Sequence, residues 1–436
     1  MIKDYIKEYA KQYSNKIFIT IDNKDITYRQ FDNRIYAIEL FIHSQKIFPK
    51  RIKINCLNEC NILASIIACN RTNAIPIVFP PHDKLIKFLD YDQIANSDFE
   101  INDNACIIQH DRLDGRENIF YNPKDVQCIL FTSGTEMNPK AVELTFSNNY
   151  NSALNWNKIV SFDLNDKYLN VLPLWHISGL SIFFRSIYFN FQSIISNYNK
   201  TKVSSLMQRC NINCISVVPK MIDELICLKN DSIFKNFKII IIGGDRINEN
   251  IFNYFKNFNK KAYISYGMTE TSSGISGYFV NDVDSYEPGF LGFPHTNTIV
   301  GINKGHIEIK SETVMKKYTN NKKCDDFFLT HDLGILQNNK LFYRSRSSNF
   351  IVSGGENINL NLIKNVIIGY NKDIKIKIAG VRNSKWGQIA VVFIEKNKHD
   401  VDAIKKHCER YLPKYMIPKY FLNPSEMQRI NKKNII

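Results

Sequence analysis

The feature that most constrains the fold of this chain is an alternation of short apolar runs with amphipathic stretches. The apolar runs are rich in β-branched residues and are bounded by Gly, Pro, Ser or Asn, which is typical of strands buried in a parallel sheet. The stretches between them have the periodicity of helices that cover such a sheet. We therefore expect an α/β fold. The expected strands are Ile17–Ile21, Ala74–Val78, Cys128–Phe131, Tyr168–Leu172, Cys214–Val218, Lys238–Ile242 and Ala262–Ser265, and the expected helices include Tyr28–Ser44 and Val203–Cys210.

After about Phe350 the pattern changes to that of a smaller unit. Its expected elements are two strands and a charged helix, at Lys375–Gly380, Ile389–Ile394 and Val401–Leu412. A chain of 436 residues has room for two or three domains, and this change of pattern indicates two. We expect the joint between them near Arg346–Ile351.

Composition places the chain among folded proteins. Hydrophobic residues make up 44% of the sequence, which is enough for a packed core. Lys and Arg outnumber Asp and Glu by 57 to 42, giving a net charge of +15. Such a charge suits nucleic acid, an anionic membrane surface or polyphosphate ligands. Because Lys, Asn and Ile are frequent throughout and no dense basic tract stands out, we attribute the excess to overall composition and expect no nucleic-acid partner.

No segment predicts export or membrane insertion. Met1–Tyr5 opens the chain without the apolar core of a signal peptide, and the apolar run at Phe237–Gly244 is far shorter than the ~18 residues of a membrane span. Ten cysteines without a secretory signal indicate reduced thiols and a cytoplasmic location. Two closely spaced cysteine pairs lack a neighbouring His cluster, so we expect them to face the core, with a metal site as the alternative: Cys56/Cys60 and Cys210/Cys214.

One stretch combines the residue types that bind phosphate. The apolar run at Ile129–Phe131 is followed by Thr132-Ser133-Gly134-Thr135-Glu136-Met137-Asn138-Pro139-Lys140. Small residues let backbone N–H groups turn toward an anion, hydroxyls add donors, and lysine adds a positive charge. The stretch is not a Walker A loop, because the second glycine and the Lys-Ser/Thr pair are missing. Taken alone, such a stretch is more often an ordinary turn.

Further sequence blocks, in a fixed order, favour the interpretation of this stretch as a phosphate loop over an ordinary turn. They are Ile26–Phe31 upstream, and Leu172–Gly179, Ile242–Asp245, Tyr266–Thr271, Leu329–Gly334 and Arg346–Ile358 downstream. Together the blocks resemble the adenylate-forming superfamily of acyl-CoA synthetases, luciferases and peptide-synthetase adenylation domains, and they cover almost the whole chain. Within the superfamily they are most similar to the o-succinylbenzoate–CoA ligases of menaquinone synthesis.

The resemblance implies a fold, an activity and a set of ligands. The fold would be a large N-terminal domain of mixed sheets layered with helices (residues 1–348) and a small, mobile α+β C-terminal domain (residues 349–436). The enzyme would use ATP and Mg²⁺ to form an acyl-adenylate from a small carboxylic acid, and would then pass the acyl group to coenzyme A. A homodimer is left open.

The resemblance also implies roles for single residues. Tyr266 would lie against adenine, Asp332 would accept the ribose hydroxyls, and Thr269 would hydrogen-bond the α-phosphate. Glu270 would hold Mg²⁺, a hard cation that prefers carboxylate and phosphate oxygens. His176 would line the acyl pocket or act as a gate. The full ATP site would comprise Thr132, Ser133, Gly134, Thr135, Lys140, Gly243, Gly244, Tyr266, Gly267, Met268, Thr269, Asp332 and Arg346. Taken singly, each could be an ordinary turn or core residue.

The C-terminal blocks, Ala379–Gln388 and Leu412–Lys419, also resemble the superfamily. Lys432 matches the lysine that acts in adenylation, although the shortened block leaves Lys433 as the alternative. Asn349 would be the hinge. Gly354, Gly355 and Glu356 would form the surface on the CoA side.

Some residues depart from the superfamily pattern and leave other functions open. Glu136 puts a negative charge beside the phosphates, and Met137 replaces a glycine. The alternatives are another acyl- or aryl-CoA synthetase, an acyl-carrier ligase, or a nucleotide-binding protein that has lost turnover. If the acid is o-succinylbenzoate, its second carboxylate needs a cationic partner, for which Arg185 and Lys220 are candidates.

Overall fold

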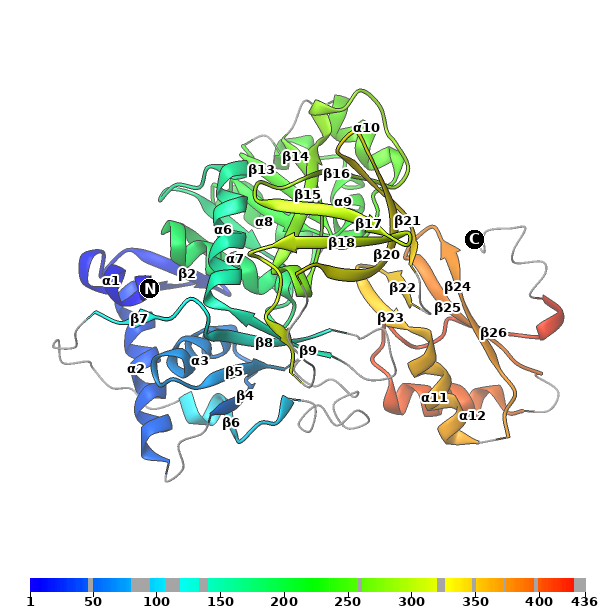
Figure 1. Ribbon diagram of the computed structural model, residues 1–436, viewed down its shortest axis with the longest axis horizontal. Coiled ribbons are helices and arrows are strands. Elements are labelled where there is room, and N and C mark those ends of the chain that lie inside the picture. The colour runs from blue at the N-terminus through cyan, green and yellow to red at the C-terminus, as the bar shows by residue number, and fades with distance from the viewer. Residues whose placement is uncertain are drawn as a thin grey trace.

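The computed structural model describes residues 1–45, 50–79, 95–106, 118–132, 140–234, 236–257, 261–319, 326–346, 350–371, 373–395 and 399–426. Within them the chain forms a large unit of mixed sheets and helices and a smaller C-terminal unit, drawn in orange and red in Figure 1. The helices are α1 (Tyr5–Gln12), α2 (Tyr28–Ser44), α3 (Glu59–Arg71), α6 (Phe146–Val160), α7 (Ile177–Phe189), α8 (Lys200–Arg209), α9 (Pro219–Ile226), α10 (Glu249–Asn257), α11 (Leu360–Tyr370) and α12 (Val401–Tyr411).

The largest sheet joins a parallel half to an antiparallel half. Its order is β17 (Thr298–Asn303), β18 (His306–Ser311), β20 (Phe328–Gln337), β21 (Lys340–Arg346), β16 (Phe290–Pro294), β15 (Ser273–Phe279), β14 (Ala262–Met268), β13 (Ile239–Gly243), β12 (Cys214–Val217), β10 (Lys167–Asn170), β11 (Gln192–Ile195), β2 (Ile17–Ile21) and β3 (Lys24–Thr27). From β2 to β14 neighbouring strands are parallel. From β14 to β17 they are antiparallel.

A second sheet lies beside the N-terminal helices. Its order is β19 (Lys317–Tyr318), β9 (Lys140–Thr145), β8 (Val126–Thr132), β5 (Ile75–Val78), β4 (Arg51–Asn55) and β6 (Phe99–Asn102), and the short strands β1 (Ile2–Lys3) and β7 (Phe120–Tyr121) pair separately. The expected strands are thus confirmed, with ends shifted by a few residues. The antiparallel strands from β15 to β21 were not predicted.

Helix α2 illustrates how the sequence determines an element. Thr27 accepts a hydrogen bond from the N–H of Gln30, whose side chain in turn accepts one from the N–H of Thr27. This capping box satisfies backbone donors that a helix start leaves without partners. Phe31, Ile35 and Ile38 then follow at helical spacing and are fully buried. The expected bounds Tyr28–Ser44 are therefore met.

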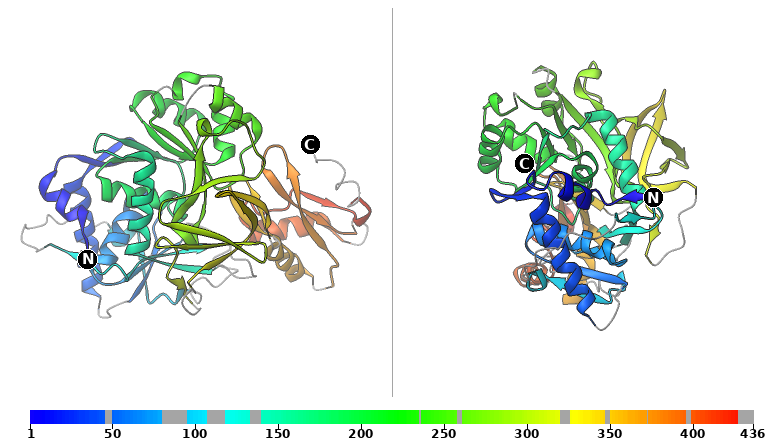
Figure 2. Two further views of the ribbon diagram at one scale, coloured as in Figure 1. Left: turned by 45° about the horizontal axis from the view of Figure 1, so that its top comes forward. Right: turned by 90° about the vertical axis from the view of Figure 1, so that its left-hand side faces the viewer.

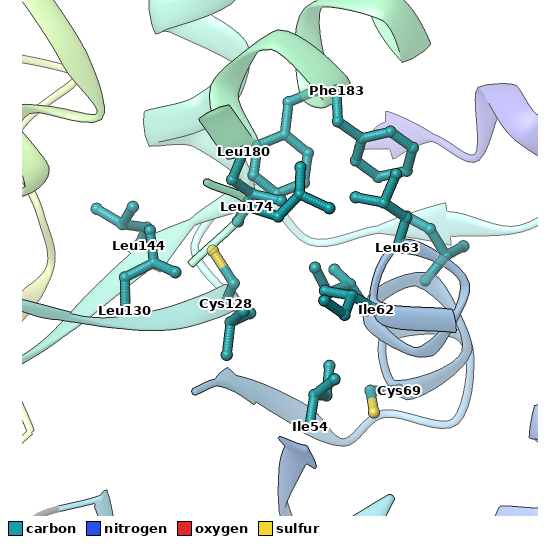
Figure 3. Packing of buried hydrophobic residues seen from close by; sticks show 14 of the residues in the cluster. Ile54, Ile62, Leu63, Cys69, Cys128, Leu130, Leu144, Leu174, Leu180 and Phe183 are labelled. Atoms are coloured by element: carbon teal, nitrogen blue, oxygen red, sulfur yellow. The ribbon is translucent and has the colours of Figure 1, made fainter. Parts of the chain in front are cut away.

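Helix α3 packs against the second sheet and closes the N-terminal part of the core. Figure 3 shows Ile62 and Leu63 of α3 facing Cys128 of β8 and Phe183 of α7 across a continuous apolar region. Three of the four cysteines in the expected pairs, Cys56, Cys60 and Cys214, are also buried. These thiols therefore serve packing, as expected.

The C-terminal unit has a sheet of its own, shown from further directions in Figure 2. Its strands are β23 (Glu356–Asn359), β22 (Phe350–Ser353), β25 (Gly387–Phe393), β24 (Lys377–Asn383) and β26 (Tyr420–Leu422), with α11 and α12 packed on them. A large and a small unit are therefore present, while a boundary at residues 348/349 stays a prediction. Among the described residues no helix is both long and apolar enough to cross a membrane.

Candidate active site

A cavity of about 2340 Å³ lies between the two units, at the carboxyl ends of the parallel strands. Ligands of open α/β sheets bind at this edge, because chain segments leave the strands there in loops. The wall includes Tyr266 at the end of β14 and Gly243 at the end of β13. The small unit contributes Gly354, Gly355 and Glu356.

The predicted phosphate loop connects β8 and β9. Thr132 and Lys140 are direct partners across this hairpin, so the loop starts and ends at one place on the cavity wall. The Thr132 hydroxyl is buried and forms no hydrogen bond with the described residues. The Lys140 ammonium lies 4.9 Å from the centroid of the Tyr318 ring. Ser133, Gly134 and Thr135 lie outside the described residues, as do Glu136 and Met137.

Glu270 lies next to this hairpin, in a single 3₁₀ turn (Thr269–Thr271) that follows β14. The Tyr318 hydroxyl donates to Oε1 of Glu270 over 2.9 Å, and the Glu270 carbonyl accepts from the Met315 N–H over 2.8 Å. Tyr318 thus joins the Lys140 cation to the Glu270 carboxylate. A carboxylate beside a lysine and a hydroxyl suits a magnesium–phosphate group.

Asp332 and Tyr266 form the next part of the wall. The Tyr266 hydroxyl donates to Oδ2 of Asp332 over 2.8 Å. Asp332 on β20 is 6% exposed and pairs in register with Arg346 on β21, whose side chain lies outside the described part. The predicted adenine and ribose residues are therefore brought together from strands far apart in the sequence.

Gly267, which follows Tyr266, allows a close backbone approach. A Cβ at this position would lie 2.0 Å from the Ser273 carbonyl oxygen, so only glycine fits between β14 and β15. Gly243, Gly244, Met268 and Thr269 line the same cavity.

Arg185 is a buried cation on another wall of the cavity, with 2% exposure. Its guanidinium stacks on Trp156 at 4.5 Å and donates to Oγ of Ser181 (3.1 Å) and of Ser273 (2.9 Å). Within the described part of the chain its Nε has no hydrogen bond and no carboxylate pairs with it. Burial lowers the pKa of Arg185 to about 10, so the side chain remains charged at neutral pH. Such a site is prepared to receive an anion.

His295 and Trp156 place uncharged aromatic side chains next to Arg185. Nε2 of His295 shares a hydrogen bond of 2.8 Å with the Tyr263 hydroxyl. Burial, with the nearby Arg185 charge, lowers the pKa of His295 to about 4, so this imidazole is neutral near pH 7. Gly274 lies against Trp156, where a Cβ would come within 2.7 Å of the indole. The wall suits a flat ring next to a negative charge.

His176 connects the two units. Its Nε2 lies 3.4 Å from Oε2 of Glu356. Burial raises the pKa of Glu356, but the charge and hydrogen bond of His176 outweigh this effect and leave the pKa lowered. The predicted gate residue thus contacts the predicted CoA side.

Lys220 lines the cavity as well, and two further predicted residues lie outside the described part of the chain. Lys220 contacts Trp386 of the small unit. Asn349 and Lys432 lie outside the described residues. Sequence reasoning missed Tyr318 and Trp156, which belong to no recognisable block. Within the described part no group of three or more His, Cys, Asp or Glu side chains could hold a metal ion.

Comparisons with known proteins agree with this geometry. A family model described as AMP-binding enzyme matches residues 80–319. A 2-succinylbenzoate–CoA ligase of Listeria monocytogenes serotype 4b is 31% identical over 428 residues, which are 95% of this chain and 88% of the relative. One from Listeria innocua is 31% identical over 304 residues, 67% of this chain; the chain thus spans only 64% of that relative's length.

Solved structures show the same fold. An o-succinylbenzoate CoA synthetase of Bacillus subtilis, a double mutant bound to a product analogue, matches with a TM-score of 0.87 at 22% identity and covers 99% of both chains. The same enzyme in complex with ATP and magnesium matches with a TM-score of 0.74, covering 97% of this chain and 95% of that one.

Proposed function

The chain belongs to the AMP-binding enzyme family, and we propose that it is an ATP-dependent acid–CoA ligase that acts on o-succinylbenzoate. One observation carries the proposal. A single cavity is lined by the phosphate hairpin, by the Tyr266–Asp332 pair, by the Arg185 wall and by Glu356 of the small unit. A nucleotide, an acid and a thiol can therefore meet in one place.

The reaction has two steps. The carboxylate of the acid attacks the α-phosphorus of ATP, the bond to the bridging oxygen breaks, and pyrophosphate leaves. The thiolate of CoA then attacks the acyl carbon of the acyl-adenylate and displaces AMP, leaving a thioester. The protein performs little covalent chemistry, so its contribution is to position the reactants and to stabilise charge.

Each residue would position a reactant or stabilise charge according to its place in the cavity. Lys140 and Thr132 would hold the β- and γ-phosphates, Tyr266 would pack on adenine, and Asp332 would accept both ribose hydroxyls. Thr269 would donate to the α-phosphate. His176 would separate the acyl pocket from the thiol channel. These roles rest on the superfamily resemblance together with the shared cavity.

Magnesium fits the site through Glu270. Mg²⁺ usually keeps several waters and binds one or two carboxylates together with substrate phosphates, so a single carboxylate near Lys140 suits it. When bound, the ion neutralises phosphate charge. Tyr318 would keep Glu270 oriented for this role.

The Arg185 wall supports a dicarboxylic aromatic acid. o-Succinylbenzoate carries a ring and two carboxylates, of which one is activated and one is not. Arg185 offers a buried charge to the second carboxylate, and Trp156 offers a flat apolar surface to the ring. Benzoate and palmitate lack that second carboxylate.

ATP–pyrophosphate exchange with a panel of acids tests the proposal. We expect o-succinylbenzoate to stimulate exchange far more than benzoate or palmitate. Equal stimulation by a fatty acid would refute o-succinylbenzoate as the substrate, but the assignment as an acyl-CoA ligase would stand. If no acid stimulates exchange, the assignment as a ligase is refuted. Thioester formation with CoA, compared with a phosphopantetheinylated carrier protein, identifies the acceptor. The proposal includes a cytoplasmic location, where ATP and CoA are available, and leaves a homodimer open.

Arg185 itself gives a sharper test. Replacing Arg185 with Gln removes the charge that would pair with the second carboxylate, so the preference for o-succinylbenzoate over benzoate should fall about 10- to 100-fold in exchange assays, the scale of a lost charge-assisted contact. Arg185→Lys keeps the charge and should restore part of the preference. An unchanged preference in folded R185Q would exclude Arg185 from substrate recognition.

A further inference from the structure

Trp156 of α6 closes the part of the cavity that contains Arg185. Its side chain lines the cavity, yet Trp156 is only 1% exposed, so most of the indole is packed against protein. Behind it lies a buried apolar cluster that includes Val160, Phe162 and Tyr263. The indole meets the Tyr263 ring edge-to-face, with the centroids 5.6 Å apart. The cavity therefore cannot extend past Trp156 unless this packed core is displaced.

The neighbours of Trp156 hold the indole in one place. The Arg185 guanidinium stacks on it at 4.5 Å, and the His295 ring meets it edge-to-face at 5.4 Å. Arg185 is itself fixed by hydrogen bonds to the hydroxyls of Ser181 and Ser273. Within the described residues the indole N–H is buried and forms no hydrogen bond, so stacking and packing fix the ring. Because protein cores are close-packed, Trp156 acts as a rigid stop.

Gly274 of β15 makes room for this indole. A Cβ at position 274 would lie 2.7 Å from the indole and 2.5 Å from Oγ of Ser265, so any side chain there would displace one of them. The φ angle of Gly274 does not lie in the left-handed region, so the backbone conformation does not require glycine. The space that Trp156 occupies therefore accounts for the glycine, and the two residues form a complementary pair.

This pair limits how far an acid can reach into the cavity. In the function proposed above, on which this inference rests, the acid lies between Thr269 at the α-phosphate and Arg185 at the second carboxylate. Because Trp156 packs directly on Arg185, a longer acid cannot move its second carboxylate deeper. We propose that Trp156, seated against Gly274, sets the maximum length of the acid that the enzyme accepts.

The accepted acids are then aromatic dicarboxylates no longer than o-succinylbenzoate. Each additional methylene between the ring and the aliphatic carboxylate would press the acid against the indole. One methylene more or less in an apolar pocket changes selectivity by about 10- to 200-fold, so the length of the acid becomes a strong criterion. Arg185 selects for charge, whereas Trp156 selects for length.

Pyrophosphate exchange with a series of acids tests the proposal. o-Succinylbenzoate is compared with the two homologues whose aliphatic chain is longer by one and by two methylenes. In the parent, kcat/KM should fall at least about 10-fold with the first additional methylene. Trp156→Leu opens space beside Arg185 and should raise kcat/KM for the longer acids, relative to o-succinylbenzoate, about 10-fold. In Trp156→Leu/Gly274→Ala the added methyl group refills part of this space, so the ratio should return toward that of the parent.

Phe162→Leu is the matched control. Phe162 belongs to the same buried cluster as Trp156 but is not among the described residues that line the cavity, so its loss loosens the core and should leave the ratio unchanged. Trp156→Phe, a smaller change, keeps the test open if Trp156→Leu does not fold. Equal use of the longer acids by the parent, an unchanged ratio in a folded Trp156 variant, or the same change in Phe162→Leu would overturn the proposal. Absence of exchange with o-succinylbenzoate in the parent would instead refute the proposed function.

Discussion

At the scale of single residues, the contact between Asp332 and Tyr266 is the most specific evidence for nucleotide binding. The hydroxyl of Tyr266 donates to one oxygen of Asp332, and that carboxylate is 6% exposed. A carboxylate can accept two hydroxyls at once, which matches the paired hydroxyls of a ribose. The aromatic ring is thereby placed beside the position at which the ribose would lie.

Asp332→Ala should weaken ATP binding and slow exchange. The change removes a bidentate acceptor from a desolvated site, a loss of about 2–4 kcal/mol. Tyr266→Phe is the matched control, because it removes only the hydroxyl contact and should cost about 1 kcal/mol. The KM for ATP in pyrophosphate exchange measures both. If D332A behaves like the parent, Asp332 is only a residue of the β20 strand.

At the scale of elements, strands with continuous apolar runs could be predicted, whereas the antiparallel strands of the large unit from β15 to β21 could not. β13 reads Ile239-Ile240-Ile241-Ile242-Gly243 and is covered on both faces, so its apolar run is continuous. β20 alternates buried and half-exposed residues, and its polar Thr330 and Asp332 interrupt the run. A search for continuous β-branched runs therefore finds the first kind and misses the second.

The candidate site also contains features that could be predicted from the sequence and features that could not. Residues within one block, such as Tyr266 and Glu270, could be predicted because each block is local in sequence. The contacts of Tyr318 with Glu270 and of Arg185 with Ser273 could not, because they join segments that only the fold brings together. Trp386 stood in a recognised block, but nothing in the sequence placed Lys220 against it.

Arg71 at the end of α3 ties three helices together. Its guanidinium contacts Asp4 before α1 at 2.7 Å, and Asp32 and Glu39 of α2 at 2.7 and 3.0 Å. Burial raises the pKa of Asp4, but the charge and hydrogen bond of Arg71 outweigh this and leave it lowered. The stability contributed by Asp4 is thus present above its ordinary pKa and lost as the pH falls below it.

Arg71→Ala should lower the free energy of unfolding by about 3–5 kcal/mol at pH 7, because it leaves buried carboxylates without their cation. Arg29→Ala removes an exposed arginine and should stay within about 0.5 kcal/mol. Urea unfolding at pH 7 and at pH 4 measures both variants. The deficit of R71A should shrink at pH 4, and a deficit independent of pH would argue against the charge explanation.

At the scale of the whole molecule, docking of the small unit leaves Asp245 half-buried. A Cβ on Gly387 would lie 3.0 Å from its Oδ2, so the small unit approaches the carboxyl closely. Burial raises the pKa of Asp245 to about 6, although the N–H and charge of Arg246 act against this. Docking is therefore disfavoured as the pH rises from the ordinary value of 3.8 through about 6.

Asp245→Asn should remove this penalty. The rate of thioester formation from supplied acyl-adenylate, divided by the rate of the parent, should be about 3- to 10-fold at pH 7.5 and smaller at pH 5, and should approach one only below the ordinary pKa of 3.8. Because both enzymes use the same thiol at the same pH, the ratio removes the effect of CoA thiol ionisation on the two rates. A ratio that does not change between these two pH values would exclude Asp245 as a determinant of docking.

The two half-reactions place opposite demands on the small unit, and Lys432 tests whether it alternates between them. The docked arrangement brings Glu356 to His176 and Trp386 to Lys220, so it suits thioester formation. Adenylation would need Lys432, which lies outside the described residues, to reach the α-phosphate.

Lys432→Ala should slow acyl-adenylate formation about 10²- to 10³-fold, the scale of one lost charge contact in the transition state. Thioester formation from supplied acyl-adenylate should keep its rate. Lys433→Ala is the matched control. An effect confined to Lys433→Ala would shift the assignment of the adenylation lysine by one residue. If neither variant separates the two half-reactions, alternation of the small unit between two arrangements is refuted.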